Sequence, residues 1–393
     1  MKVRRGVATA WISAQVAVLA VAACTSAPAP SPDTTAPSTS DVTTAPMLAP
    51  PALFYSKAGS LYISDPAGAP GRKLTDGPAD SEPAPSPDLA HVAFIRKAHA
   101  SGYGGELWVL DLSPDREPEG APYRLVEPAS LPSIYADTEV GDVPRRIVSP
   151  RWSPTGDQVA FLDAGEGGGL LLVAYAVNGE IVSPEQRLFA DAGYAWAPDG
   201  QHIAWTGGRS DVSPVDVNVL AVGGDSTPVV RDTNAFSVTY GDDGQSVLFA
   251  NGDASGELFA DIPFALRGGG VYSVAAPGAM PIDPPAAPTS LFAGQAMFGD
   301  VAVLESGAVA FTETGADGDS KTIQVLDPRS SVPRTAVADV AADSPGPVWG
   351  RGDVVAYVDA APSRPLIVTD SENRTPEPID TGVDAFAWPP PPR

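Results

Sequence analysis

The stretch that decides the fold of this 393-residue chain is Trp196-Ala197-Pro198-Asp199-Gly200-Gln201-His202-Ile203-Ala204-Trp205. Its Pro-Asp-Gly segment predicts a tight turn, because glycine adopts the positive φ that such turns require. The Ile-Ala-Trp segment alternates large and small apolar residues, which is typical of a strand in a sheet that is buried on both faces. The stretch therefore predicts a β-hairpin, in which one strand ends at Trp196 and the next contains Ile203.

The same pattern returns along the chain from residue 51 onward. A strong second copy is Trp-Ser-Pro-Thr-Gly-Asp-Gln-Val-Ala-Phe at 152–161, and weaker copies lead to apolar triplets. The triplets end at residues 55, 94, 161, 205, 249, 311 and 357, with spacings of 39, 67, 44, 44, 62 and 46. Most of these spacings equal the length of a four-stranded propeller blade, about 40–45 residues. The two long spacings predict insertions at 112–146 and 261–290.

Each triplet is followed by a further strand, such as Leu107-Trp108-Val109-Leu110-Asp111, and then by a short last strand, such as Tyr123-Arg124-Leu125-Val126. This order resembles the WD40-like repeat of TolB-like β-propellers and of the propeller domains of prolyl-oligopeptidase-type enzymes. The resemblance covers about residues 51–393 and implies an all-β, seven-bladed β-propeller, with six blades as the alternative. In that family the turn joins a blade's innermost strand to its second. The final strand, near 384–389, should therefore complete the first blade.

The N-terminal segment has the pattern of an export signal. A basic start (Lys2, Arg4, Arg5) precedes an apolar run too short for a comfortable membrane span. The run ends in Val21-Ala22-Ala23-Cys24, which resembles a bacterial lipobox and implies a diacylglycerol on Cys24. The alternative is an ordinary secretory signal with an incidental cysteine. We expect a lipoprotein signal peptide at 1–23, a disordered Pro/Ser/Thr/Ala-rich tether at 24–50 and the propeller domain at 51–393.

Composition limits the chemistry that the chain can perform. With 48 acidic and 24 basic residues, the formal charge of −24 repels phosphates, so nucleic acid is not an expected partner. Cys24 is the sole cysteine, which excludes an internal disulfide and thiolate-held zinc. Three scattered histidines and the absence of a Gly-x-Ser-x-Gly motif offer no catalytic constellation. We therefore predict no catalytic residue, no metal site and no cofactor.

A set of aspartates forms the candidate binding site. Each lies close to where an innermost strand is expected to begin, so together they should surround one mouth of the central channel. They are Asp80, Asp191, Asp232, Asp343 and Asp384. The resemblance implies binding in this region, and an acidic mouth favours a cation or a basic peptide. Neutralising Asp80, Asp191 and Asp343 together as Asn should weaken binding and, by removing repulsion, raise thermal stability. The alternatives are that they only cap loops, or that the insertions carry recognition.

These features predict an extracytoplasmic lipoprotein, anchored in the cell envelope through Cys24. Its propeller is expected to bind a protein, a peptide or an envelope polymer without catalysis. The resemblance to peptidase propellers leaves two alternatives: a propeller-type hydrolase or lyase acting on extracellular sugar or peptide, and a structural subunit of an envelope complex. The step from propeller to binding rests on analogy, because a fold does not determine a function.

Overall fold

The repeated turns form hairpins, as the sequence predicts. Gly156, Gly200 and Gly244 have φ of 78°, 66° and 64°, the region that glycine occupies without strain. β11 (Tyr194–Trp196) pairs antiparallel with β12 (His202–Gly207), with Trp196 opposite Ile203. The structure is a computed structural model that describes residues 51–390, apart from 102–103, 132–145, 166–167, 183–192, 208–214, 234, 253–268, 277–286, 295, 316–319, 343–344 and 374–375.

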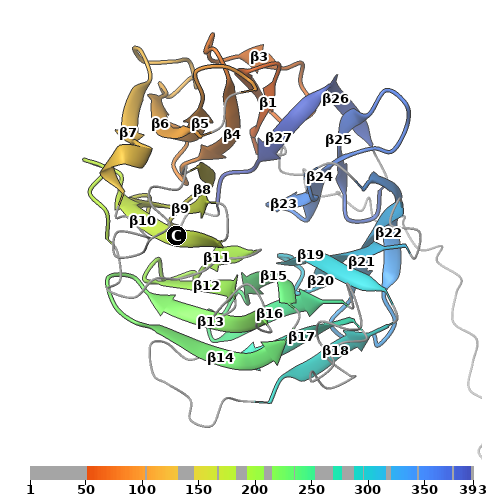
Figure 1. Cartoon of the computed structure of the whole chain (residues 1–393). Coiled ribbons are helices and arrows are strands. Elements are labelled where there is room, and N and C mark those ends of the chain that lie inside the picture. The colour runs from red at the N-terminus through yellow and green to blue at the C-terminus, as the bar shows by residue number, and fades with distance from the viewer. Residues whose placement is uncertain are drawn as a thin grey trace, which may run out of the picture. The chain divides into compact units, whose positions relative to one another are not determined.

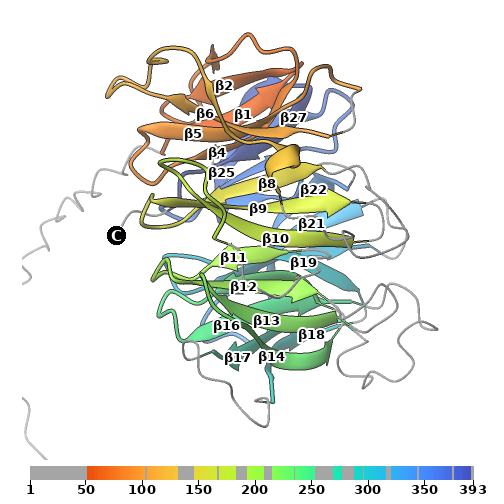
Figure 2. The same cartoon turned by 60° about the vertical axis from the view of Figure 1, so that its left-hand side comes forward.

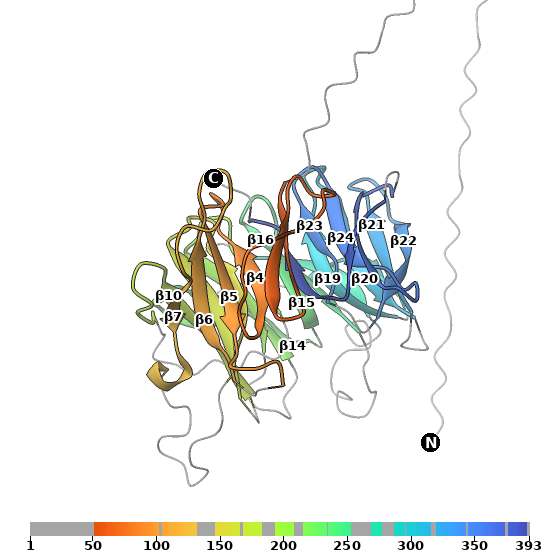
Figure 3. The same cartoon turned by 90° about the horizontal axis from the view of Figure 1, so that it is seen from above.

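Seven antiparallel sheets follow one another around a ring (Figure 1). All lie in one compact unit, Leu48–Arg393, and Figures 2 and 3 show adjacent sheets side by side from two further directions. From the centre outward, blade one consists of β27 (Val383–Ala387), β1 (Leu53–Lys57), β2 (Ser60–Ser64) and β3 (Arg72–Lys73), and blade two consists of β4 (Asp80–Pro85), β5 (His91–Arg96), β6 (Glu106–Asp111) and β7 (Tyr123–Val126). Blade three consists of β8 (Ile147–Trp152), β9 (Gln158–Gly165) and β10 (Gly168–Tyr175). Blade four consists of β11, β12, β13 (Val215–Ala221) and β14 (Ser226–Thr233).

Blades five to seven follow the same order. Blade five consists of β15 (Ala235–Tyr240), β16 (Ser246–Asn251), β17 (Gly270–Ala275) and β18 (Thr289–Ala293). Blade six consists of β19 (Met297–Val303), β20 (Val309–Thr314), β21 (Ser320–Leu326) and β22 (Arg334–Ala341). Blade seven consists of β23 (Val348–Gly350), β24 (Val354–Val358), β25 (Pro365–Asp370) and β26 (Glu377–Thr381). A short 3-10 helix, η1 (Pro128–Ser130), follows β7. The all-β fold with seven blades is thus confirmed over six.

The C-terminal strand closes the ring, as predicted. β27 pairs antiparallel with β1, with Tyr55 opposite Phe386, so blade one contains both ends of the propeller sequence. This pairing covers a sheet edge that would otherwise offer unpaired main-chain groups to other molecules.

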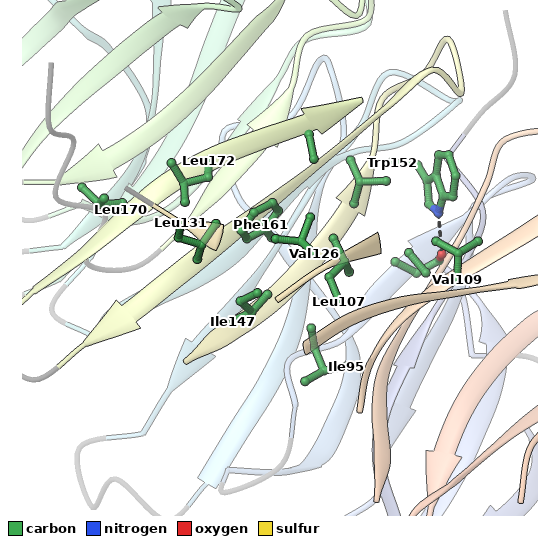
Figure 4. Packing of buried hydrophobic residues seen from close by; sticks show 14 residues of the cluster. Ile95, Leu107, Val109, Val126, Leu131, Ile147, Trp152, Phe161, Leu170 and Leu172 are labelled. Carbon is green, nitrogen blue, oxygen red and sulfur yellow. Dashed lines mark hydrogen bonds between the residues drawn. The ribbon is translucent and has the colours of Figure 1, made fainter. Parts of the chain in front are cut away.

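The hydrophobic core lies between blades rather than within them. Among the described residues, each of seven hydrophobic clusters combines side chains of adjacent blades. Figure 4 shows the cluster between blades two and three, which contains Leu107 and Val109 of β6 and Phe161 of β9; Val109 lies beside Trp152. Strand alternation explains this division: Val159 and Phe161 pack toward blade two, whereas Ala160 between them packs toward blade four. The Val-Ala-Phe triplets therefore hold the blades to one another.

Each of the two predicted insertions contains secondary structure. Residues 112–146 contain β7 and η1, and 132–145 lie outside the described residues. Residues 261–290 are not one loop, because they contain β17, the third strand of blade five. Residues 183–192, where the order of the repeat places the last strand of blade three, also lie outside the described residues, so this blade has three described strands.

Candidate functional site: the central cavity

A cavity of about 830 Å³ lies at the centre of the ring and is lined by the innermost strand of every blade. Each of these strands has a sheet neighbour on its outer side only. The other edge of each strand therefore presents main-chain N–H and C=O groups toward the centre. Proline belongs on such an edge, because it lacks the N–H that a second neighbour would need. Pro83, Pro150 and Pro347 occupy equivalent places in blades two, three and seven, and all three line the cavity.

Tryptophans at the ends of the innermost strands fasten each blade to the preceding one. The indole Nε1 of Trp152 donates to the carbonyl oxygen of Ala84 at 2.8 Å. Trp196 donates likewise to Arg151 at 3.1 Å, and Trp388 donates to Val348 at 3.0 Å. Alternate residues of the same strands point the other way, toward the following blade, because side chains alternate along a strand.

In blades two, three and six, a bulge three residues before the strand end places a side chain at the cavity wall. The bulged residues Glu82, Ser149 and Asp300 have φ of 51°, 54° and 46°, and the pairing register shifts beside each. We call these three and the corresponding residues of the other blades the bulge ring. All seven members line the cavity: Glu82, Ser149, Gly193, Ser237, Asp300, Gly346 and Ala385.

The bulge ring contains two carboxylates, in blades two and six, which lie across the cavity from each other in blade order. Glu82 accepts a hydrogen bond from the amide of Ser149 at 2.5 Å. Burial raises the pKa of the Glu82 carboxyl above its ordinary value, although this bond and the charges of Lys97 and Arg146 oppose the rise. Asp300 accepts from Thr312 at 2.9 Å and lies 3.8 Å from Lys321 Nζ. Both carboxylates are thus partly compensated by protein groups.

Arg151 is the one basic side chain among the cavity-lining residues that the structure describes. Its guanidinium lies 4.7 Å from the centre of the Tyr194 ring and donates to the Tyr194 carbonyl oxygen. The hydroxyl group of Tyr194 in turn donates a hydrogen bond to the carbonyl oxygen of Ala160 in blade three, at 2.9 Å. Stacking against a fixed aromatic ring therefore holds this cation in place at the cavity wall.

The cavity reaches the turns at which the innermost strands end. Asp242, in the turn after β15, lines it there. Partial burial raises the pKa of the Asp242 carboxyl, and the negative charges of Asp243, Glu305 and Asp353 raise it further. These four residues belong to the turns of blades five, six and seven. Negative charge therefore gathers on one side of this mouth.

Three of the five predicted aspartates lie in described residues, and none of these three lines the cavity. Asp80 begins β4, is buried, and both its carboxylate oxygens accept from Arg96, at 2.6 and 2.8 Å. Asp232 is an exposed residue of β14, the outermost strand of blade four, so it does not enter an innermost strand. Asp384 is exposed in β27, and partial burial raises the pKa of its carboxyl.

The remaining predicted residues, Cys24, Asp191 and Asp343, lie outside the described residues. A role for the five aspartates in binding stays a prediction. Sequence reasoning overlooked Glu82, Ser149 and Gly346, although a shared signal marks them: each directly precedes a proline that lines the cavity. A proline repeated at one place of an apolar repeat indicates a free strand edge.

The described part of the chain lacks two other classes of site. No group of three His, Cys, Asp or Glu side chains there could hold a metal ion. Nor is any helix there long and apolar enough to cross a membrane.

No protein-family model matches this sequence, and no curated protein matches it. Solved structures resemble its fold. The propeller domain of the Trilobed protease from Pyrococcus furiosus has a TM-score of 0.52 at 13% identity, with 82% of this chain and 87% of that chain covered. TolB from Acinetobacter baumannii has a TM-score of 0.50 at 13% identity, with 86% and 82% covered. A prolyl endopeptidase has a TM-score of 0.50 at 15% identity, and this chain spans 43% of its length.

Seven blades, a ring closed by the C-terminal strand and a central cavity define the class of this protein, a seven-bladed β-propeller. Within that class the chain has a TolB-like propeller fold, as its sequence repeat predicts. At these low identities the similarities establish the fold alone. The Pyrococcus protein is described as having an open velcro topology, whereas β27 closes the ring in this chain.

Proposed function

We propose that this chain is an extracytoplasmic binding protein, anchored to a membrane through Cys24, whose central cavity receives a segment of a protein, a peptide or an envelope polymer without catalysis. The observation that carries this proposal is the cavity of about 830 Å³ to which all seven blades contribute. That volume lies within the roughly 300–1,000 Å³ typical of ligand sites. The inward strand edges offer main-chain groups that an extended chain can hydrogen-bond.

The proposed location rests on the N-terminal sequence. A basic start, a short apolar run and Val21-Ala22-Ala23-Cys24 form the pattern of a lipidated export signal. A Pro/Ser/Thr/Ala-rich segment follows, whose composition suits a tether between a lipid anchor and a folded unit. The formal charge of −24 suits a protein that stays soluble at the membrane surface.

Filling the cavity tests the proposal. Ala195 and Ala302 are half-buried lining residues of blades four and six, so replacing both with Phe narrows the cavity from two sides. After chemical crosslinking in the native host, the unaltered protein should co-purify with a defined envelope component, and the Phe variant should retain less than about a tenth of it. Val177→Phe is the matched control, because Val177 is 89% exposed on an outer turn.

Melting curves must first establish that the cavity variant folds, since overpacking costs about 1–3 kcal/mol. Equal capture by a folded cavity variant and by the control would contradict the proposal. So would turnover of extracellular peptides or polysaccharides by the purified protein.

A further inference from the structure

The cavity wall formed by blades three and four carries a positive charge, that of Arg151. We propose that an extended peptide segment binds in the cavity with the carboxylate of a Glu or Asp side chain held by the Arg151 guanidinium. This inference rests on the proposed function and specifies its ligand. The charge of this ligand is the opposite of the charge that the acidic mouth predicted from the sequence would attract.

The Arg151 side chain is held in place but is not neutralised. Its guanidinium lies 4.7 Å from the centre of the Tyr194 ring and donates to the carbonyl oxygen of the same residue. Among the described residues, no carboxylate lies within ion-pair distance of it, and the side chain is exposed. A guanidinium has five N–H donors, so most of these donors are left for water or for a ligand.

The carboxylates that line the cavity do not cancel this charge. Burial raises the pKa of the Glu82 carboxyl, and a main-chain amide donates to it at 2.5 Å. Asp300 lies 3.8 Å from Nζ of Lys321, a cation of its own blade. Asp242 belongs to blade five, so blade four separates it from Arg151 in the order of the ring. The positive charge on the wall of blades three and four is therefore available to an anion.

The surroundings of Arg151 suit the main chain of a peptide. Gly193 and Ala195 of blade four line the cavity beside it, and such short side chains leave the inner edge of this blade open to a ligand. An extended segment can pair its own N–H and C=O groups with a free strand edge. The cavity continues past Arg151 on both sides, to Ser149 and to Pro154. A segment can therefore pass the guanidinium and present a side chain to it.

These features discriminate between ligand classes. A guanidinium binds a carboxylate through two parallel hydrogen bonds, which gives the pair both strength and a fixed geometry. An acidic polysaccharide would carry a carboxylate on successive sugars, and some of these would meet Asp242 and Asp300. A peptide with one carboxylate supplies the anion without that repulsion, and its main chain can follow the strand edges.

Binding of two pentapeptides tests the inference. Ac-Thr-Val-Glu-Val-Thr-NH2 should bind the full-length protein at least about tenfold more tightly than Ac-Thr-Val-Gln-Val-Thr-NH2, which has nearly the same shape without the charge. This preference should fall as NaCl rises. Arg151→Gln should reduce it to less than about twofold and leave the affinity for the Gln peptide within about twofold, which also shows that the variant is folded. Arg151→Lys keeps the charge without the paired donors, so it should retain part of the preference. Isothermal titration calorimetry measures all of these affinities.

Arg231→Gln is the matched control, because Arg231 is exposed on β14, the outermost strand of blade four, and the change in charge is the same. Equal loss of preference from Arg231→Gln and Arg151→Gln would overturn the inference, since general surface charge would then account for binding. Equal affinity for the two peptides, no measurable binding of the Glu peptide, or tighter binding of Ac-Thr-Val-Lys-Val-Thr-NH2 or of a uronic-acid trisaccharide would also overturn it. If Ala195→Phe with Ala302→Phe abolishes partner capture while the Glu and Gln peptides bind alike, the inference fails and the proposed function stands.

Discussion

Tryptophan has a definite structural task in this protein. Trp152, Trp196 and Trp388 each end an innermost strand and donate to the main chain of the preceding blade, at 2.8–3.1 Å. An aromatic ring alone would fill the same space between blades, but the indole N–H also satisfies a carbonyl on an edge that lacks a sheet neighbour. Each of these tryptophans therefore stabilises the contact between two blades both by burying its ring and by donating a hydrogen bond.

Replacing single tryptophans with phenylalanine separates these two contributions. Trp152→Phe loses both ring volume and the bond to Ala84, whereas Trp349→Phe loses ring volume and an indole N–H without a described partner. We expect Trp152→Phe to lower the free energy of unfolding by at least about 1 kcal/mol more than Trp349→Phe does. Denaturation in urea measures the difference. Equal losses would mean that packing, and not the hydrogen bond, stabilises the blade interface.

Asp80 shows how a partner reverses an expectation based on charge. Its carboxylate is fully buried and is held by Arg96, whose guanidinium also stacks 4.8 Å from the Trp108 ring. Asp80→Asn would leave that cation without its counter-charge, so we expect a loss of about 2–4 kcal/mol in unfolding free energy. The gain in stability predicted for neutralised aspartates should therefore not occur at this residue.

Asp384→Asn is the control for Asp80→Asn. It makes the same chemical change close to the start of the adjacent innermost strand, but at an exposed residue, so stability should change by less than about 0.5 kcal/mol. Thermal unfolding of both variants checks this, and a gain in stability from Asp80→Asn would show that the ion pair with Arg96 is not stabilising.

Among the strands, β27 is the one whose removal we expect to lower the stability of the fold most. It pairs with β1, and its Phe386, together with Trp388, belongs to the cluster between blades seven and one. Deleting residues 384–393 removes this strand, exposes an edge and opens that cluster. The loss should be several kcal/mol, a large share of the ~5–15 kcal/mol that stabilises a typical protein. Denaturation and size-exclusion chromatography should report lower stability and association through the bare edge of β1.

A shorter deletion is the matched control for ring closure. Removing residues 391–393 leaves β27, Trp388 and the Trp388–Val348 hydrogen bond intact, so the melting temperature should stay within about 2 °C. Should the two deletions melt alike, pairing of β27 with β1 would not be what closes the ring.

For the molecule as a whole, we expect attachment to a membrane through a lipid on Cys24. The chain has a formal charge of −24, which gives it no electrostatic attraction to an anionic bilayer, so we expect the N-terminal segment to provide the proposed membrane association. Cys24→Ala should abolish metabolic lipid labelling and move the protein from the membrane fraction to the soluble fraction. Cys24→Ser serves as a second variant with a similar side-chain size. Lipid labelling that survives either change would disprove lipidation at this residue.

The repeat can be predicted from the sequence because it depends on interactions between residues that are close together in the chain. Turn glycines such as Gly200 need positive φ, and triplets such as Val159-Ala160-Phe161 alternate sides with the strand period, so both features recur at blade spacing. The number of blades followed from counting these signals, and the closing role of the last strand followed from the resemblance to TolB-like propellers. The lengths of loops did not follow, because β17 lies within what reads as a single insertion.

The candidate site depended on tertiary structure, because its residues meet only when seven blades close into a ring. Whether Asp80 presents a free charge is decided by Arg96 on the neighbouring strand, and whether Glu82 reaches the cavity is decided by a bulge that shifts the register of β4. Asp242 gains its electrostatic environment from the turns of two other blades. The sequence by itself determined the repeating unit and the number of copies, since turn chemistry and strand period act over a few residues. Only the tertiary structure decided which charges face the cavity and which are neutralised, since these interactions join residues that lie far apart in the chain.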